Sequence, residues 1–358
     1  MKIYFFCYPQ GPPDKAGYQH QVVVLAEGLK EHGIEFFSNI NYWKIRPGST
    51  EYLLNAKPDH HYEDFDVVVV NSMFYDYGRE DLLPEQIFSK KRKFKLVFID
   101  RSDGYITPGF LPKIRNADLV LKSHYNRKYT YPENFVPWQF GLSNRIISSL
   151  NPLPFDDRQN EILVNYRVQH NVRNLAEKKV MGEVCKHLKR NSDVDSFDER
   201  PDGEYDRLYW EQTGRRHSPA YYKRLERSKA CAAFGGTLQN SLTAKQNIFS
   251  KYLGKVDYRY NFLKHDRVYQ YDSWRFWESL ASGCVTLHLD FDKYGAVIPE
   301  MPQNDKHYLG IDLSDLKNTK KRITQFDRYK DISHYGREWV LKYYTPKIIA
   351  ARFLNLLE

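Results

Sequence analysis

The stretch Ser-Trp-Arg-Phe-Trp-Glu-Ser-Leu-Ala-Ser-Gly at residues 273–283 carries side chains whose types and spacing suggest ligand chemistry. In a helix, Arg275, Glu278 and Ser282 lie three and four positions apart and therefore share one face. A glutamate carboxylate can accept two hydrogen bonds from the vicinal diol of a ribose, and a neighbouring arginine can reach a phosphate. The pattern fits nucleotide binding; the competing interpretation is a local surface ion pair between Arg275 and Glu278.

A second group of polar side chains lies in the segment 164–173, between a predicted strand and a predicted helix. It contains Arg167, Asn171 and Arg173. Phosphate binding requires fixed positive charge and free backbone N–H groups at the start of a helix, and this segment offers both. We therefore predict that Arg167 or Arg173 contacts a phosphate; the alternative is that both are solvated at the surface.

Two adjacent glycines, Gly235 and Gly236, come directly after the predicted strand 229–234. Because glycine has no Cβ, the pair would let the backbone approach a bound nucleotide closely. A plain turn explains the same two glycines equally well.

Carboxylates at the ends of strands in the first half are candidates for a general base. Asp100 comes directly after the apolar run 97–99 and is the first choice, with Asp103 and Asp14 as rivals. A base that activates a hydroxyl group must lie within hydrogen-bond reach of it, which loops at strand ends allow. The alternative for Asp100 is a helix N-cap or a salt bridge with Arg101.

The elements that would position these residues alternate between strands and helices. In the first half we expect strands at 2–8, 34–37, 66–70, 94–99 and 117–122, and a helix at 18–33 that ends at a glycine. In the second half we expect strands at 161–167, 229–234 and 284–289, and helices at 173–188, 273–283 and 347–357. We interpret residues 191–218 as a mobile loop or insertion.

This alternation predicts an α/β fold of two Rossmann-like parallel-sheet domains, because parallel strands need helical crossovers on both faces. A length of 358 residues also favours two domains. The polar, proline-containing stretch 151–158 has the character of a linker. We therefore divide the chain into domains at 1–152 and 153–340, with a C-terminal helical segment at 341–358.

The composition bounds the environment of the protein. The net charge is +9, and the basic residues are dispersed apart from Lys90–Lys93. This excess is compatible with a solvated surface, with peripheral contact to an anionic membrane, or with nucleic acid. The four cysteines match no metal or redox spacing, and neither a signal peptide nor an apolar run long enough to cross a bilayer is evident. We expect a cytoplasmic protein, with the inner membrane face as a place of peripheral contact.

Residues 275–287, Arg-Phe-Trp-Glu-Ser-Leu-Ala-Ser-Gly-Cys-Val-Thr-Leu, resemble the nucleotide-binding signature of GT-B glycosyltransferases of the family 1 and 4 kind. The Arg-x-x-Glu spacing, with Asp290 and Asp292 after the next strand, is similar to that of phage DNA β-glucosyltransferases. The resemblance implies that Glu278 holds the ribose and that the basic residues of 164–173 bind the pyrophosphate. It also implies that Asp100 occupies the place of the base, and that the two domains face a central cleft, with the last helix returning to the first domain.

Two departures from the family pattern favour an inverting transfer. Retaining members often carry a glutamate eight positions before the ribose glutamate, where this chain has Gln270, and no histidine comes after the strand ending at Asp100. Asp290-Phe-Asp292 spells the D-x-D metal motif of the other glycosyltransferase architecture. In the GT-B arrangement basic side chains usually neutralise the diphosphate, so we expect no tightly bound metal and leave open a loosely held divalent cation.

The resemblance implies an enzyme that transfers a sugar from a UDP- or GDP-sugar to a hydroxyl acceptor, a cell-surface glycan or lipid-linked saccharide, as in polysaccharide biosynthesis. The alternatives are a glucosyltransferase acting on DNA or another polyanion, and a non-catalytic nucleotide-sugar-binding protein of the same fold. An NAD-dependent enzyme is disfavoured because the first strand–loop–helix unit lacks a G-x-G-x-x-G motif.

Overall fold

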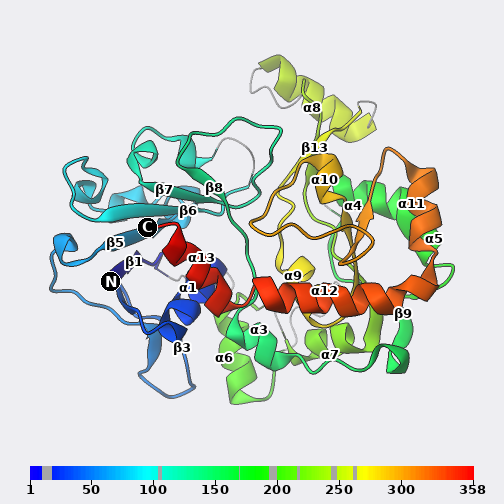
Figure 1. Ribbon diagram of the computed structural model, residues 1–358, viewed down its shortest axis with the longest axis horizontal. Coiled ribbons are helices and arrows are strands. Elements are labelled where there is room, and N and C mark those ends of the chain that lie inside the picture. Colours follow the sequence, from blue (N-terminus) through cyan, green and yellow to red (C-terminus); the bar gives the residue numbers. More distant parts are fainter. Residues whose placement is uncertain are drawn as a thin grey trace.

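The computed structural model describes residues 1–9, 18–103, 107–168, 170–192, 200–215, 218–242, 248–260 and 264–358. These residues fold into two halves, each built around a parallel β-sheet covered by helices (Figure 1). No helix in this part of the chain is long and apolar enough to cross a lipid bilayer.

The first sheet has six strands in the order β2-β1-β5-β6-β7-β8, and every neighbouring pair is parallel. Its strands are β1 (Lys2–Phe6), β2 (Glu35–Ser38), β5 (Val67–Asn71), β6 (Lys95–Asp100), β7 (Leu119–Lys122) and β8 (Phe135–Pro137). The valine run of β5 is buried along its whole length, as expected of a central parallel strand covered on both faces. A separate antiparallel pair is formed by β3 (Tyr42–Lys44) and β4 (Tyr52–Leu54).

The second sheet has five parallel strands in the order β10-β9-β11-β14-β15. Its strands are β9 (Gln159–Val164), β10 (Lys189–Ser192), β11 (Ser228–Ala232), β14 (Val285–Leu289) and β15 (Leu309–Ile311). An antiparallel pair, β12 (Thr237–Gln239) and β13 (Arg267–Tyr269), lies beside it in the same half. The five apolar strands that the sequence predicts at 66–70, 94–99, 117–122, 229–234 and 284–289 are confirmed to within a few residues.

Helices fill the connections between the strands. The first half contains α1 (His20–Glu31), α2 (Met73–Asp76) and α3 (Asn144–Ser149). The second half contains α4 (Asn171–Ala176), α5 (Gly182–Val184), α6 (Glu204–Gln212), α7 (Pro219–Arg227), α8 (Ile248–Tyr260), α9 (Trp274–Ala281), α10 (Phe291–Tyr294), α11 (Leu316–Ile323) and α12 (Tyr329–Tyr343). A π-helical turn, Glu177–Met181, joins α4 to α5, so that one continuous helical segment comes after β9.

The chain returns to the first half at its end, as expected for the last helix. Helix α12 runs along the second half, and α13 (Pro346–Asn355) then packs against α1 (Figure 1). The contact is close because Gly28 of α1 faces the backbone of Pro346, where a Cβ on residue 28 would come within 2.0 Å of the carbonyl oxygen. Lys95 of β6 also donates a hydrogen bond to the carbonyl of Leu357.

The segment 191–218 is more ordered than the expected loop, since it contains the end of β10 and helix α6. The amide side chain of Gln212 accepts a hydrogen bond from the Lys44 N–H at 2.7 Å and donates to the Lys44 carbonyl at 3.1 Å. Trp210 and Gln212 are buried, so α6 docks on β3 of the first half although most of its residues are charged or polar. Residues 193–199 and 216–217 lie outside the described chain.

Each sheet contains one point where the strand order reverses direction. In the first sheet this point lies between β1 and β5, and in the second it lies between β9 and β11. Ligands of open α/β sheets bind beyond the carboxyl ends of the strands at such points, because the crossovers leave in opposite directions there and open a crevice. The loops after β9 and β11 are therefore where a ligand of the second half is expected.

Candidate functional site

Helix α9 is buried on nearly all sides, although its sequence pattern predicts one polar face. Trp277 is 0% exposed and Glu278 is 1% exposed. The helix start is held by Asp272, whose carboxylate accepts hydrogen bonds from the Trp277 indole N–H at 2.6 Å and from the Phe140 backbone N–H at 2.8 Å. Because Phe140 belongs to the first half, Asp272 fixes α9 against the boundary between the two halves.

Ser282 lies at the opposite end of α9 and serves the helix itself. Its hydroxyl donates to the carbonyl of Ser279 at 2.8 Å, and its own carbonyl accepts a hydrogen bond from Arg158 at 2.6 Å. Gly283 then takes a φ of +75°, which suits glycine and turns the chain into β14. The helical spacing predicts that Ser282 shares a face with Arg275 and Glu278. In the structure, Ser282 is the C-cap residue of α9.

Glu278 is the centre of a buried hydrogen-bond network rather than a surface ion pair. Its two carboxylate oxygens accept hydrogen bonds from the hydroxyl groups of Tyr221, at 3.0 Å, and Tyr222, at 3.3 Å, both on α7. The Tyr222 hydroxyl in turn accepts a hydrogen bond from buried Arg145 at 2.7 Å. Burial would lower the pKa of Arg145, but Tyr222 and Tyr18, and after them the charge of Glu278, raise it overall.

Arg275 and Arg173 come together at the point where the second sheet reverses. Arg275 donates from Nε to the carbonyl of Asn165, directly after β9, and Arg173 donates from Nε to the carbonyl of Phe234, just after β11, at 3.0 Å. Burial and the positive charge of Arg275 lower the pKa of Arg173 to about 10. Among the described residues neither guanidinium forms an ion pair. Two neighbouring cations at this edge suit an anion.

The remaining polar residues of the segment 164–173 serve different purposes. The side chain of Asn171 both donates to and accepts from the backbone of Leu238, at 3.1 and 2.8 Å, so it holds β12 in place. Arg167 is exposed at the surface, and its carbonyl accepts a hydrogen bond from Arg173 at 3.1 Å. Arg173 of this segment therefore joins Arg275 at the strand ends.

The two glycines after β11 are required because the backbone of Tyr269 and Tyr271 passes close to them. A Cβ on Gly235 would lie 3.0 Å from the carbonyl oxygen of Tyr271, and one on Gly236 would lie 2.7 Å from that of Tyr269. Gly236 also has a φ of +96°. Their lack of a side chain is explained by this close approach to the backbone at and directly after the end of β13, without reference to a nucleotide.

Asp100 lies in the interior of the first half. Its side chain is 0% exposed, lies 3.5 Å from the equally buried ammonium group of Lys122, and accepts hydrogen bonds from the Thr107 hydroxyl and, at 3.1 Å, from the Ser102 N–H. Burial lowers the pKa of Lys122, although the charge of Asp100 opposes that shift. The structure therefore places the first-choice base in an internal ion pair, away from solvent.

Asp103 is instead a half-exposed carboxylate at the boundary between the halves. One oxygen lies 3.4 Å from Nε2 of His124, and the other accepts a hydrogen bond from the amide of Gln270 at 2.5 Å. Burial alone would raise the pKa of Asp103, but the hydrogen bond and charge of His124, with Arg101 and Lys122, lower it overall. This carboxylate is therefore ionised at neutral pH. Asp14, the third candidate, lies outside the described residues.

His124 and Gln270, which orient Asp103, both have a left-handed backbone, each with a φ of +55°. Such a conformation is uncommon for residues other than glycine and concentrates at functional sites. Nδ1 of His124 accepts a hydrogen bond from the Asp272 N–H at 3.1 Å, which leaves Nε2 as the nitrogen that faces Asp103. Sequence reasoning missed His124; its position two residues after β7, at the same sheet edge as Asp100, was the available signal.

Charges from both halves of the chain act on His170. Burial lowers the pKa of His170, the residue before α4, and the charge of Arg173 adds to this effect while that of Asp103 opposes it. The charges of Arg173 and Asp103 therefore both influence the pKa of His170. The candidate site is formed by these three residues with Arg275, His124 and Gln270.

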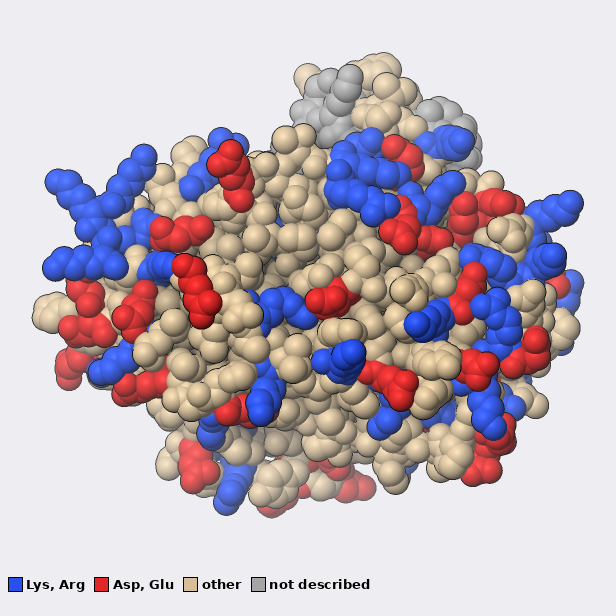
Figure 2. Space-filling model, in the orientation of Figure 1, with Lys and Arg blue, Asp and Glu red and all other residues tan. Residues whose placement is uncertain are grey.

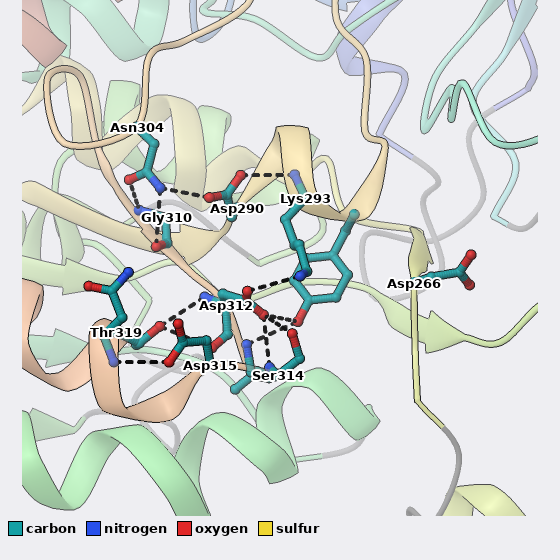
Figure 3. A network of polar contacts seen from close by, with 12 residues as sticks. Asp266, Asp290, Lys293, Asn304, Gly310, Asp312, Ser314, Asp315 and Thr319 are labelled. Atoms are coloured by element: carbon teal, nitrogen blue, oxygen red, sulfur yellow. Dashed lines mark hydrogen bonds and ion pairs between the residues drawn. The ribbon is translucent and has the colours of Figure 1, made fainter.

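The acidic residues after β14 and β15 are engaged in internal contacts (Figure 3). Asp290 caps α10 by accepting from the Lys293 N–H at 3.0 Å and accepts from the Asn304 amide at 2.7 Å. Asp292 forms an ion pair with Arg127 at 3.2 Å. In the described residues, no group of three or more His, Cys, Asp or Glu side chains is arranged to hold a metal ion. The D-x-D sequence is used here for capping and for contact between the halves.

No family model matches the chain, and a search of curated proteins found none similar in sequence. Solved structures do match along the entire chain. An alpha-glucosyltransferase in complex with UDP matches with a TM-score of 0.52 and 10% identity, covering 100% of this chain and 99% of that one. An alpha-glucosyltransferase in complex with UDP-glucose and DNA containing an abasic site matches with a TM-score of 0.50 and 11% identity, covering 99% and 98%.

A third match is an alpha-glucosyltransferase in complex with UDP and a 13-mer DNA containing an HMU base, with a TM-score of 0.52 and 9% identity, covering 100% and 99%. At these identities the likeness concerns the fold. It confirms the prediction of two Rossmann-like domains in the GT-B arrangement.

Proposed function

We propose that the chain is a glycosyltransferase that moves a sugar from a UDP- or GDP-sugar to the hydroxyl group of an acceptor. The observation that carries this proposal is the position of Arg173 and Arg275 at the reversal point of the second sheet, with His170 under the electrostatic influence of both Arg173 and Asp103. Paired guanidinium groups suit a diphosphate, and an ionised carboxylate suits the activation of a hydroxyl. Solved structures of similar fold hold UDP or UDP-glucose, which supports the same class of donor.

In this proposal Arg173 and Arg275 bind the diphosphate and stabilise the negative charge that it gains as it leaves. Glu278 binds the ribose diol, with Tyr221 and Tyr222 fixing its orientation. Since two cations already neutralise the diphosphate, a tightly bound metal ion is not needed, and a loosely held divalent cation is compatible with the same site.

The proposed transfer is a single displacement with inversion, in which Asp103 is the general base. The acceptor oxygen forms a bond to the anomeric carbon while the bond from that carbon to the diphosphate breaks. The electron pair of the broken bond leaves with the diphosphate, and the acceptor proton passes to the Asp103 carboxylate. His124 is a positioning residue, because it holds Asp103 without reaching the acceptor itself.

For the acceptor we propose a cell-surface glycan or a lipid-linked saccharide, as in polysaccharide biosynthesis at the cytoplasmic face of a membrane. DNA is the second candidate acceptor. It is favoured by the net charge of +9 and by the DNA held in two of the solved structures of similar fold.

Thermal unfolding of the purified chain with UDP, GDP and their sugars tests the donor site. We expect one nucleoside diphosphate to raise the Tm, because a ligand that binds only the folded state stabilises it. Arg173→Ala and Arg275→Ala should each weaken binding by roughly 10- to 100-fold, whereas the exposed Arg227 of α7 provides a matched control, Arg227→Ala.

Slow hydrolysis of the matching nucleotide sugar separates an enzyme from a binding protein. Release of free sugar by the wild-type chain, lost in Arg275→Ala, supports a glycosyltransferase. Binding without any turnover, with or without candidate acceptors, would indicate a non-catalytic protein of the same fold, and no binding of any nucleoside diphosphate would refute the proposal.

A further inference from the structure

Helix α8 stands away from the body of the molecule (Figure 1). Large apolar side chains at its start are exposed to solvent. Ile248 is 89% exposed, Phe249 68% and Tyr252 69%, and Leu242, shortly before the helix, is 48% exposed. We call Ile248, Phe249 and Tyr252 the apolar tip. Large apolar side chains gathered on a protruding element mark a contact with another molecule, because water would otherwise surround them.

The sides of α8 differ in exposure. Leu253 and Val256 are half-buried, whereas Tyr252 and Lys255 are exposed. The helix therefore has one half-buried side and a tip that is open to solvent.

Two described lysines lie close to the tip in the chain. Lys255 of α8 and Lys264, shortly after the helix, are both exposed. Figure 2 shows further Lys and Arg side chains gathered directly below α8, in the region of β13 and α10.

This basic collar consists of Arg127, Lys128, Arg267 and Lys293. Arg267 donates to the carbonyl of Lys128 at 3.2 Å, and Lys128 donates to the carbonyl of Lys293 at 2.9 Å. Burial lowers the pKa of the Lys128 ammonium, and the charges of Arg267, Arg127 and Lys293 add to that effect despite the opposing charge of Asp266. Three of these cations form ion pairs, Arg127 with Asp292, Arg267 with Asp266 and Lys293 with Asp312. The four cations therefore exceed these three carboxylates by one positive charge, and the exposed Lys255 and Lys264 add to the field that attracts anions.

We propose that the apolar tip and the basic collar dock the protein on an anionic lipid bilayer. An apolar tip flanked by lysines and arginines combines the two attractions that hold peripheral helices at a membrane, which are insertion of apolar side chains and contact with anionic headgroups. Helix α8 has 13 residues and a length of about 20 Å. It inserts its first turn and does not span the bilayer. This surface is separate from the candidate donor site, so the proposal does not depend on the proposed function.

Flotation of the full-length chain with vesicles tests the proposal. We expect binding to vesicles of phosphatidylcholine with phosphatidylglycerol, weak binding to pure phosphatidylcholine, and a strong decrease at high salt. Ile248→Ser with Phe249→Ser should weaken binding by about tenfold or more, and Lys255→Glu with Lys264→Glu by at least about fivefold.

Matched variants test whether a loss of exposed apolar area or of positive charge outside the tip and collar also changes vesicle binding. Tyr335→Ser with Ile348→Ser changes exposed apolar residues on α12 and α13, and Lys347→Glu reverses an exposed charge on α13. These controls should bind vesicles as the wild type does, and all variants should keep the wild-type Tm.

Three results would overturn the proposal. One is wild-type binding by the tip variant, and another is equal binding to neutral and anionic vesicles. The third is a lack of vesicle binding together with binding of double-stranded DNA, or self-association measured by light scattering, that depends on the same tip residues.

Discussion

Nε2 of His124, in the first half of the chain, lies 3.4 Å from a carboxylate oxygen of Asp103, while Nδ1 of the same ring accepts the backbone N–H of Asp272 in the second half. One imidazole thus connects the proposed base to the residue that anchors α9. Because both of its nitrogens are engaged, the ring has one orientation, and the position of Asp103 depends on how the halves are assembled. Gln270 holds the other oxygen of Asp103 from the second half, which reinforces this dependence.

Asp103→Asn removes the ionised carboxylate and keeps the shape of the side chain. We expect the rate of sugar transfer, or of donor hydrolysis, to fall by about 10²- to 10⁴-fold, while the affinity for the nucleoside diphosphate stays near that of the wild type. Kinetics and calorimetry on the same preparation measure the two quantities. Asp331→Asn, an exposed carboxylate on α12, is the control, and a fully active Asp103→Asn enzyme would remove Asp103 from the mechanism.

The variant Asp100→Asn tests whether Asp100, the general base favoured by the sequence, has a structural or a catalytic role. Its partner Lys122 is completely buried, so loss of the negative charge leaves an uncompensated ammonium group in the interior. Such a loss typically destabilises a protein by about 3–5 kcal/mol, which unfolding in denaturant would reveal. A variant that kept its stability and lost only its rate of transfer would instead identify Asp100 as the base.

The strands of both halves could be predicted from the sequence because parallel strands are buried on both faces and appear as short apolar runs. Val67–Val70 and Val285–Leu289 are examples. Helix α12 was missed although its buried residues Ile332, Gly336 and Trp339 have helical spacing, since charged and polar residues separate them. β15 has only three residues, which is too short for a periodic signal.

The candidate site could be predicted only in part, because the sequence indicates which residues come after a strand but not which of their side chains turn inward. Arg173 and Arg275 were found through their motifs, and the structure brings them together. Asp100 and Asp103 look alike in sequence. In the structure, Asp100 forms a buried ion pair with Lys122 of the neighbouring strand, whereas Asp103 accepts a hydrogen bond from Gln270 of the second half. Contacts of this kind depend on the packing of distant elements, which local patterns do not encode.

The buried carboxyl of Asp272 predicts a dependence of stability on pH. Burial raises its pKa from 3.8 to about 6, against the opposing effects of His124 and of the hydrogen bonds from Phe140 and Trp277. Between pH 4 and 6 the folded state therefore binds more protons at this site than the unfolded state, so this group favours folding more strongly as the pH falls through that range.

Asp272→Asn removes this titration. Relative to the variant, the wild type should gain on the order of 2 kcal/mol in free energy of unfolding between pH 7.5 and 4.5. Denaturant unfolding of both proteins at the two pH values measures the difference, and other titrating groups cancel in the comparison. An unchanged difference between the two proteins would show that Asp272 keeps an ordinary pKa.

The return of α13 to the first half depends on Gly28, and this contact predicts the effect of a single methyl group. A Cβ at residue 28 would lie 2.0 Å from the Pro346 carbonyl oxygen and 2.7 Å from the Cβ of Ala350, and backbone cannot move aside as a flexible side chain can. Gly28→Ala should therefore destabilise the protein by roughly 1–3 kcal/mol or more and displace α13 from α1.

Gly182→Ala is the matched control, because a Cβ at residue 182 of α5 would meet nothing within 4 Å. That variant should be unchanged or slightly more stable, since alanine has the higher helix propensity. Thermal unfolding compares the two variants, and proteolysis near residue 345 reports release of the C-terminal helix. If Gly28→Ala unfolded at the wild-type temperature and resisted the protease equally, the close contact of α1 with α13 would not be what holds the last helix to the first half.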